Sequence, residues 1–169
     1  KNVKENVGLL DMTAFAKCRI KGPGAEEFLD KLVANKLPKK VGRINLCHAL
    51  NTKGGVHSEF TIMRESENSF YLVSAGAYQR LDHDWIFGWM PKDGSVQFEN
   101  LTNSKGVLVV SGPKARELMQ RVSNDDFSNE NFKWLSAKQV DVGFAPVNAM
   151  RVNFCLLYTS PSPRDWMVS

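Results

Sequence analysis

A chain of 169 residues with 43% hydrophobic and 24% charged residues has the composition of a globular protein with a sizeable core. Its net charge of +4 comes from 22 basic and 18 acidic residues scattered along the chain, without a basic face interleaved with aromatic residues. We therefore do not expect a nucleic-acid partner, because nucleic-acid binders concentrate positive charge on one surface.

The cysteines and the hydropathy indicate the cellular compartment and the kinds of partner to expect. Cys18, Cys47 and Cys155 are odd in number and far apart, which predicts reduced thiols in a bacterial cytoplasm or a mitochondrial matrix. No Cys-x-x-Cys pair is available for zinc, so no metal site is predicted. No apolar run reaches the about 18 residues of a membrane span, and we expect no membrane partner.

A strand, a Gly-Pro corner and a helix follow one another twice. The first copy occupies residues 17–37 and turns at Gly22-Pro23, and the second occupies residues 107–122 and turns at Gly112-Pro113. In each predicted helix the apolar residues recur at helical spacing. They are Ala25, Phe28, Leu29, Leu32 and Val33 in the first copy and Ala115, Leu118, Met119 and Val122 in the second. The two copies predict a pseudo-repeated α+β unit.

The segment between the copies predicts an antiparallel meander and a helix. Strand patterns occupy residues 42–51, 55–65 and 69–76, with turn-forming residues between them. A helix follows, in which Tyr78, Leu81, Trp85 and Trp89 repeat at helical spacing before Pro91. Further strands are predicted in 95–102 and 147–154. The fold class is therefore α+β, with antiparallel sheets and packed helices.

The composition and the residue pattern of the sequence change at Cys155. Residues 155–169 read CLLYTSPSPRDWMVS, with two Ser-Pro pairs and no continuation of the preceding strand pattern. They could be a native proline-rich tail or a non-native, disordered addition, and we favour the second interpretation. Residues 1–154 would then form one partial domain that is truncated at both ends.

The stretch LNTKGGVHSEFTI, residues 50–62, places two glycines and an acid in a strand context. The glycine pair favours a hairpin turn, although close approach of the backbone to a ligand would also require glycine. The pleat places His57, Glu59 and Thr61 on one face of the strand. From periodicity alone, that face is simply exposed to solvent.

Five segments, taken in order, resemble the aminomethyltransferase family, which includes the folate-binding T-protein of the glycine cleavage system. They are residues 8–32, 41–62, 70–85, 101–119 and 147–154. The chain is most similar to the carboxy-terminal folate domains of dimethylglycine and sarcosine dehydrogenases, and the resemblance implies a partial aminomethyltransferase folate-binding fold.

The resemblance also implies site residues. In the T-protein a Gly-Gly motif is followed by a pair of acids, of which the second is the catalytic aspartate, and here Glu59 holds that position. Phe15, Leu46 and Val73 match the wall of the family's folate pocket, although plain core packing would explain them equally well. Ala75 replaces an asparagine of the family pattern. His48 lies near these motifs, and we do not predict it to be catalytic.

The implied activity is folate-dependent one-carbon transfer. The one-carbon unit of an oxidised methylated amine would be captured on tetrahydrofolate to give 5,10-methylenetetrahydrofolate. A covalently linked amino-terminal flavin domain would hold FAD, since this chain has no Gly-x-Gly-x-x-Gly motif. The family's Gly-Glu-x-Gly motif is replaced after Phe154, so the isolated chain is expected to be inactive. The alternative is a non-catalytic folate-binding or iron-sulfur-maintenance module of the same family.

Overall fold

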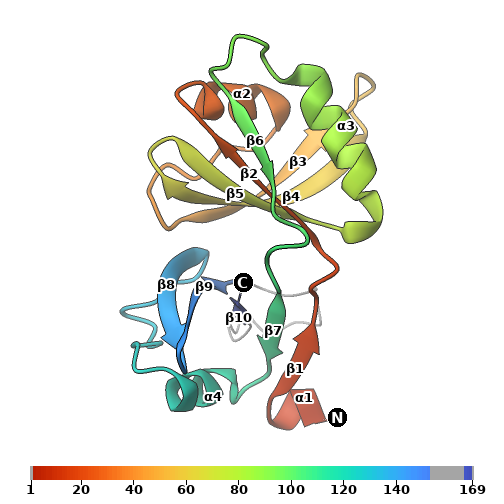
Figure 1. The fold of residues 1–169 in the computed structure, drawn as a ribbon. Helices are drawn as coiled ribbons and strands as arrows, with labels where there is room; N and C mark the ends of the chain where they lie inside the picture. The colour runs from red at the N-terminus through yellow and green to blue at the C-terminus, as the bar shows by residue number, and fades with distance from the viewer. Residues whose placement is uncertain (1, 153–165, 169) are drawn as a thin grey trace. The chain divides into compact units, whose positions relative to one another are not determined.

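The computed structural model describes residues 2–152 and 166–168 of the chain (Figure 1). The chain divides into two compact units, one formed by Ala14–Lys105 and the other by Lys1–Thr13 together with Gly106–Ser169. Within the predicted tail, residues 155–165 and 169 lie outside the described residues, whereas Trp166–Val168 form a strand, β10.

The first unit is built on a five-stranded antiparallel sheet with the order β3-β4-β5-β2-β6. Its strands are β2 (Ala16–Lys21), β3 (Ile44–Leu50), β4 (Val56–Ser66), β5 (Ser69–Ser74) and β6 (Gln97–Asn100). Consecutive pairing of β3, β4 and β5 confirms the predicted meander.

The helices α2 (Ala25–Leu32) and α3 (Gln79–Trp89) pack on one face of this sheet, and a 3-10 turn (Gly76–Tyr78) leads into α3. The core between helices and sheet is apolar. It includes Phe28, Leu29 and Leu32 of α2, Ile86 of α3, and Ile20, Cys47, Phe60, Ile62, Phe70 and Leu72 from the strands. The opposite face carries Ile44, Met63, Tyr71 and Val73, which are also buried.

The helix predicted from the spacing of Tyr78, Leu81, Trp85 and Trp89 is confirmed as α3, and its fully buried residues are Asp82 and Ile86. Tyr78, Leu81 and Trp89 are exposed, while Asp82 and Ile86 are buried. Asp82 is accommodated because its Oδ2 accepts a hydrogen bond from the Ser74 hydroxyl at 2.6 Å. Asp82 of α3 thus points inward, and the partly buried Trp85 packs against the core.

The second unit contains another five-stranded antiparallel sheet, with the order β1-β7-β10-β9-β8. Its elements are α1 (Asn2–Glu5), β1 (Gly8–Asp11), β7 (Leu108–Ser111), α4 (Ala115–Val122), β8 (Ser136–Val142), β9 (Ala145–Arg151) and β10. The core of this unit includes Val110, Met119, Phe127, Phe132 and Ala149. Each unit thus carries one strand-Gly-Pro-helix copy, β2-α2 in the first and β7-α4 in the second.

The two Gly-Pro corners have the same geometry. Gly22 has φ +122° and Gly112 has φ +125°, and each accepts a hydrogen bond at 3.0 Å from the residue that begins the following helix. A Cβ at Gly22 would lie 2.3 Å from the carbonyl oxygen of Ser95, and one at Gly112 would lie 2.5 Å from that of Asn6. Only glycine fits either corner. Among the described residues, no helix is long and apolar enough to cross a membrane.

Candidate functional site

The glycine pair belongs to a tight turn between β3 and β4. Gly54 has φ +79°, and its backbone N donates to the carbonyl oxygen of Asn51 at 2.9 Å. The Asn51 side-chain oxygen accepts from the backbone N of Lys53 at 2.9 Å and of Gly55 at 3.0 Å. These bonds confirm the turn interpretation and account for both glycines without a ligand.

A β-bulge follows the turn and changes which residues face one another. Leu50 pairs with Val56, but Ala49 pairs with Ser58, so His57 has no residue opposite it. The His57 ring stacks on Trp85 of α3, with ring centroids 4.2 Å apart. The prediction that His57 shares a face with Glu59 is therefore wrong, because the extra residue interrupts the alternation of the strand.

Beyond the bulge, three of the four predicted site residues share the sheet face opposite the helices. Leu46 pairs with Thr61, Thr61 pairs with Val73, and Glu59 lies two residues before Thr61 on β4. Directly paired residues, and residues two apart on a strand, point to the same side of a sheet. The other side carries Phe60 and its neighbours in the helix-packed core. Sequence-distant segments thus bring the acid and two apolar residues together.

The surroundings of these residues differ. The side chain of Glu59 is 59% exposed and Leu46 is 49% exposed, whereas Val73 is buried. Phe15 is half-buried and lies one residue before β2. Folate contact at Phe15, Leu46 and Val73 stays a prediction, and core packing remains the alternative for Val73.

Glu59 contacts His48, and Asn35 in turn contacts His48; the sequence analysis predicted neither contact. Oε2 of Glu59 lies 3.0 Å from Nε2 of His48, the residue directly opposite on β3. The other ring nitrogen, Nδ1, lies 3.2 Å from Oδ1 of Asn35, and that oxygen also accepts from the backbone N of His48 at 2.9 Å. The sequence predicts that β3 pairs with β4, which brings His48 near Glu59. The bulge shifts the register by one residue, so the sequence alone does not predict that the two are directly opposite.

Apolar surface beside a carboxylate could contact a flat ring that carries N–H groups. A pterin ring has flat faces suited to apolar side chains and N–H groups suited to a carboxylate. Leu46 supplies exposed apolar surface, and Glu59 supplies a carboxylate with one oxygen, Oε1, outside the His48 contact. Within residues 2–152 and 166–168, no group of three or more His, Cys, Asp or Glu side chains could hold a metal ion.

The buried thiols have no features of a nucleophile. Burial, with a smaller contribution from Asp82, raises the pKa of Cys18 to about 12. Burial also raises the pKa of Cys47 to about 11. Both side chains point into the core, so neither supplies a thiolate near neutral pH.

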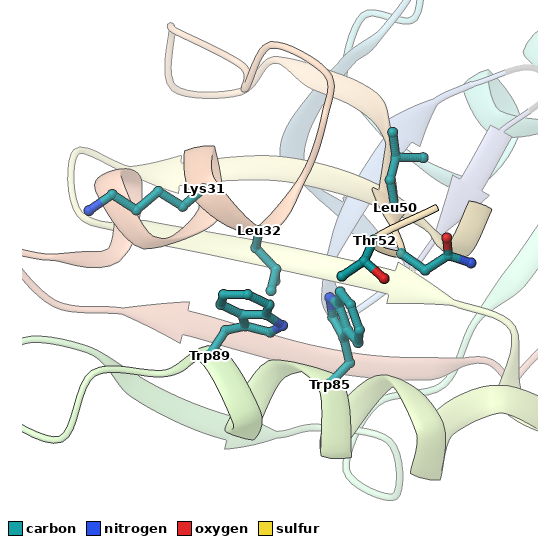
Figure 2. A pocket seen from close by; sticks show the side chains of 7 residues that line it. Lys31, Leu32, Leu50, Thr52, Trp85 and Trp89 are labelled. Atoms are coloured by element: carbon teal, nitrogen blue, oxygen red, sulfur yellow. The ribbon is translucent and has the colours of Figure 1, made fainter. Parts of the chain in front are cut away.

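A pocket of about 190 Å³ lies on the helix side of the same sheet (Figure 2). Its lining comes from α2, the end of β3 with the turn that follows, and α3: Lys31, Leu32, Leu50, Asn51, Thr52, Trp85 and Trp89. Because Glu59 points to the other side of the sheet, this pocket is separate from the carboxylate site.

Comparison with known proteins agrees with this fold. The family model described as the GCVT N-terminal domain matches residues 1–155. The mitochondrial dimethylglycine dehydrogenase of Rattus norvegicus is 36% identical over 155 residues, which are 91% of this chain and 18% of that protein. The mitochondrial pyruvate dehydrogenase phosphatase regulatory subunit of Mus musculus is 32% identical over 88% of this chain and 17% of its own length.

A solved structure shows the same fold at low sequence identity. It is the glycine cleavage system aminomethyltransferase T from Bartonella henselae, with a TM-score of 0.79 and 18% identity over 99% of this chain and 42% of that chain. The fold is therefore that of the aminomethyltransferases. The chain belongs to the GCVT family, and it spans less than a fifth of the length of the two mammalian relatives.

Proposed function

We propose that this chain captures, on tetrahydrofolate, the one-carbon unit of an oxidised methylated amine of the dimethylglycine or sarcosine type, giving 5,10-methylenetetrahydrofolate. The observation that supports the proposal is the largely exposed Glu59 carboxylate on the same sheet face as the half-exposed Leu46, and the resemblance matches Glu59 to the family's catalytic acid. The similarity to dimethylglycine dehydrogenase supports the choice of amine.

The chemistry requires a base at this place. Formation of the second bond between a folate nitrogen and the one-carbon unit releases a proton from that nitrogen. Glu59 would accept the proton at Oε1 and balance the positive charge that develops beside it. A positioned general base contributes typically about 10²- to 10⁴-fold in rate.

The remaining parts of the proposal concern the whole protein. We propose that a covalently linked flavin domain holds FAD and oxidises the amine, and that the protein works in a mitochondrial matrix or a bacterial cytoplasm. The similarity to a mitochondrial dehydrogenase of Rattus norvegicus supports this assignment. We also propose that the isolated chain is inactive, since its similarity covers 18% of that relative.

The experiment compares Glu59→Gln with Glu27→Gln in the full-length protein. Glu27 is an exposed glutamate of α2, paired with Lys31 at 2.6 Å, and serves as the matched control. Glu59→Gln should slow formation of 5,10-methylenetetrahydrofolate about 100-fold or more and leave the Kd for tetrahydrofolate within about threefold. Glu27→Gln should change neither quantity. An unchanged rate in Glu59→Gln would contradict the proposal.

The relative named as a regulatory subunit favours a second candidate, a non-catalytic folate-binding module. An iron-sulfur-maintenance role belongs to the same class of alternative. Either one predicts that the full-length protein binds tetrahydrofolate but does not form 5,10-methylenetetrahydrofolate from any oxidised methylamine donor.

A further inference from the structure

We propose that the segment after α2, residues 34–36, and His48 together position Glu59, so that His48 holds Oε2 and Oε1 is the oxygen presented to the folate nitrogen. This inference rests on the proposed function, in which Glu59 is the catalytic residue. His48 and Asn35 act only through Glu59 and are positioning residues. The arrangement needs no proton transfer between Glu59 and His48.

The segment after α2 lies along the outer edge of β3. β3 is the first strand in the order β3-β4-β5-β2-β6, so β4 pairs with its inner edge and residues 34–36 meet its outer edge. The backbone N of Ala34 donates to the carbonyl oxygen of His48 at 2.9 Å, and the backbone N of His48 donates to Oδ1 of Asn35 at 2.9 Å. The Asn45 side chain donates to the carbonyl oxygen of Lys36 at 2.7 Å. The backbone of His48 is therefore fixed from the edge of the sheet.

These bonds make His48 and Glu59 a close pair across the two strands. Both backbone groups of His48 bond to the segment after α2, so they point away from β4. In an antiparallel sheet such a residue belongs to a non-hydrogen-bonded pair, whose Cα atoms are about 4.5 Å apart instead of about 5.5 Å. Glu59 is the residue directly opposite. The His48 ring is therefore within reach of the Glu59 carboxylate.

The His48 ring has an oxygen within hydrogen-bond distance of each nitrogen. Nδ1 lies 3.2 Å from Oδ1 of Asn35, and Nε2 lies 3.0 Å from Oε2 of Glu59. A hydrogen bond of that length has one hydrogen between Nε2 and Oε2, and the carboxylate has the same direction whichever atom carries it. Only 32% of the His48 side chain is exposed, so its neighbours limit the positions that the ring can adopt.

The contact orders a carboxylate that would otherwise move. The Glu59 side chain is 59% exposed, and a glutamate on an exposed strand face has several rotamers, whose loss costs entropy. With Oε2 held by His48, Oε1 has a fixed direction on the sheet face that Glu59 shares with Leu46. Ordering of the base before the substrate binds raises kcat, because less ordering remains to be done in the transition state.

The kinetic test compares His48→Leu with His48→Gln in the full-length protein. Leucine removes the contact with Oε2, whereas glutamine retains an N–H donor for it. His48→Leu should lower kcat for 5,10-methylenetetrahydrofolate formation about tenfold, with KM for tetrahydrofolate within about twofold. His48→Gln should keep kcat within about threefold of the parent. Parental kcat in His48→Leu, or equal losses in the two variants, overturns the proposal.

Two further variants complete the kinetic test. Asn35→Ala removes an acceptor that holds His48 and should lower kcat about threefold, and parental kcat in this variant overturns the role of Asn35. His83→Leu is the matched control, because His83 is a half-buried histidine of α3, which packs on the other face of the sheet. It should leave kcat unchanged, and a loss equal to that of His48→Leu overturns the proposal. Circular dichroism melting confirms that each variant is folded.

A second measurement does not depend on activity. Crystal structures of the full-length parent and of His48→Leu show the Glu59 side chain directly. The parent should have a single Glu59 rotamer with Oε2 toward His48, and His48→Leu should have several. An unchanged single rotamer in His48→Leu overturns the proposal. A parent that forms no 5,10-methylenetetrahydrofolate contradicts the proposed function, and the two crystal structures then still decide whether His48 positions Glu59.

Discussion

Glu59 on β4 lies opposite His48 on β3, with Oε2 3.0 Å from Nε2, because a bulge near the turn shifts the register by one residue. Without the bulge, the pairing of Leu50 with Val56 would continue to place Ser58 opposite His48. The unpaired residue, His57, stacks on Trp85 instead. The one inserted residue therefore sets the pairing of Glu59 with His48, and its side chain also packs the hairpin against α3.

Leu46→Ala should weaken tetrahydrofolate binding by the full-length protein. Leu46 is half-exposed on the Glu59 side of the sheet, and losing its contact with a flat ring should raise Kd about tenfold, equivalent to about 1.4 kcal/mol. Isothermal titration calorimetry measures the change. Leu81→Ala is the matched control, because Leu81 is a similarly exposed leucine on α3, a helix that packs on the other face of the sheet. Equal losses in both variants would contradict the assignment of Leu46 to the folate site.

Arg64→Met should destabilise the first unit strongly. The buried guanidinium donates to Glu26 and to the carbonyl oxygens of Pro38, Lys39 and Glu67. Methionine leaves these carbonyls without that donor, at a cost of about 3 kcal/mol in the free energy of unfolding. Urea denaturation gives the value.

The exposed ion pair between Arg121 and Glu117 provides the control for that measurement. Arg121→Met should change the free energy of unfolding by less than about 0.5 kcal/mol, since solvent screens such a pair. A cost at Arg64 as small as that at Arg121 would show that the buried network does not stabilise the fold.

Gly22→Ala should destabilise the chain by about 2–3 kcal/mol, because the new Cβ would meet the Ser95 carbonyl oxygen and the backbone has positive φ. Gly88→Ala is the opposite case, since nothing lies within 4 Å of its added Cβ and alanine favours the helix. It should stabilise by up to about 1 kcal/mol. Thermal melts distinguish the two signs, and a neutral Gly22→Ala would contradict the tight corner.

Stability should fall as pH rises above about 9, because burial raises the pKa of the Cys47 thiol from its ordinary 9.0 to about 11. Below pH 9 the thiol is protonated in both states and its contribution is constant. Between pH 9 and 11 the unfolded chain ionises first, which favours unfolding. Cys47→Ala removes this contribution, so its urea midpoint should fall less steeply over that range than the parent's. Parallel slopes would contradict the raised pKa.

Local sequence rules predicted much of the framework. Both strand-Gly-Pro-helix copies and the β3-β4-β5 meander are confirmed, since periodicity, glycine and turn residues act over a few neighbours. The helix α3 is also confirmed, and only the structure shows that Asp82 and Ile86 are its buried residues. The same rules gave no prediction of β1, which has only four residues, or of β8, whose sequence mixes apolar and polar residues.

The sequence by itself determined the α+β class, the two glycine corners, the turn at Asn51–Gly55 and, through its resemblance, Glu59 as the acid to consider. Only the tertiary structure decided what Glu59 faces. Strand register, a bulge and the hydrogen bonds of Asn35 brought His48 to it from another strand. Such relations depend on pairing between distant segments, and no local preference of residues 35, 48 or 59 specifies them.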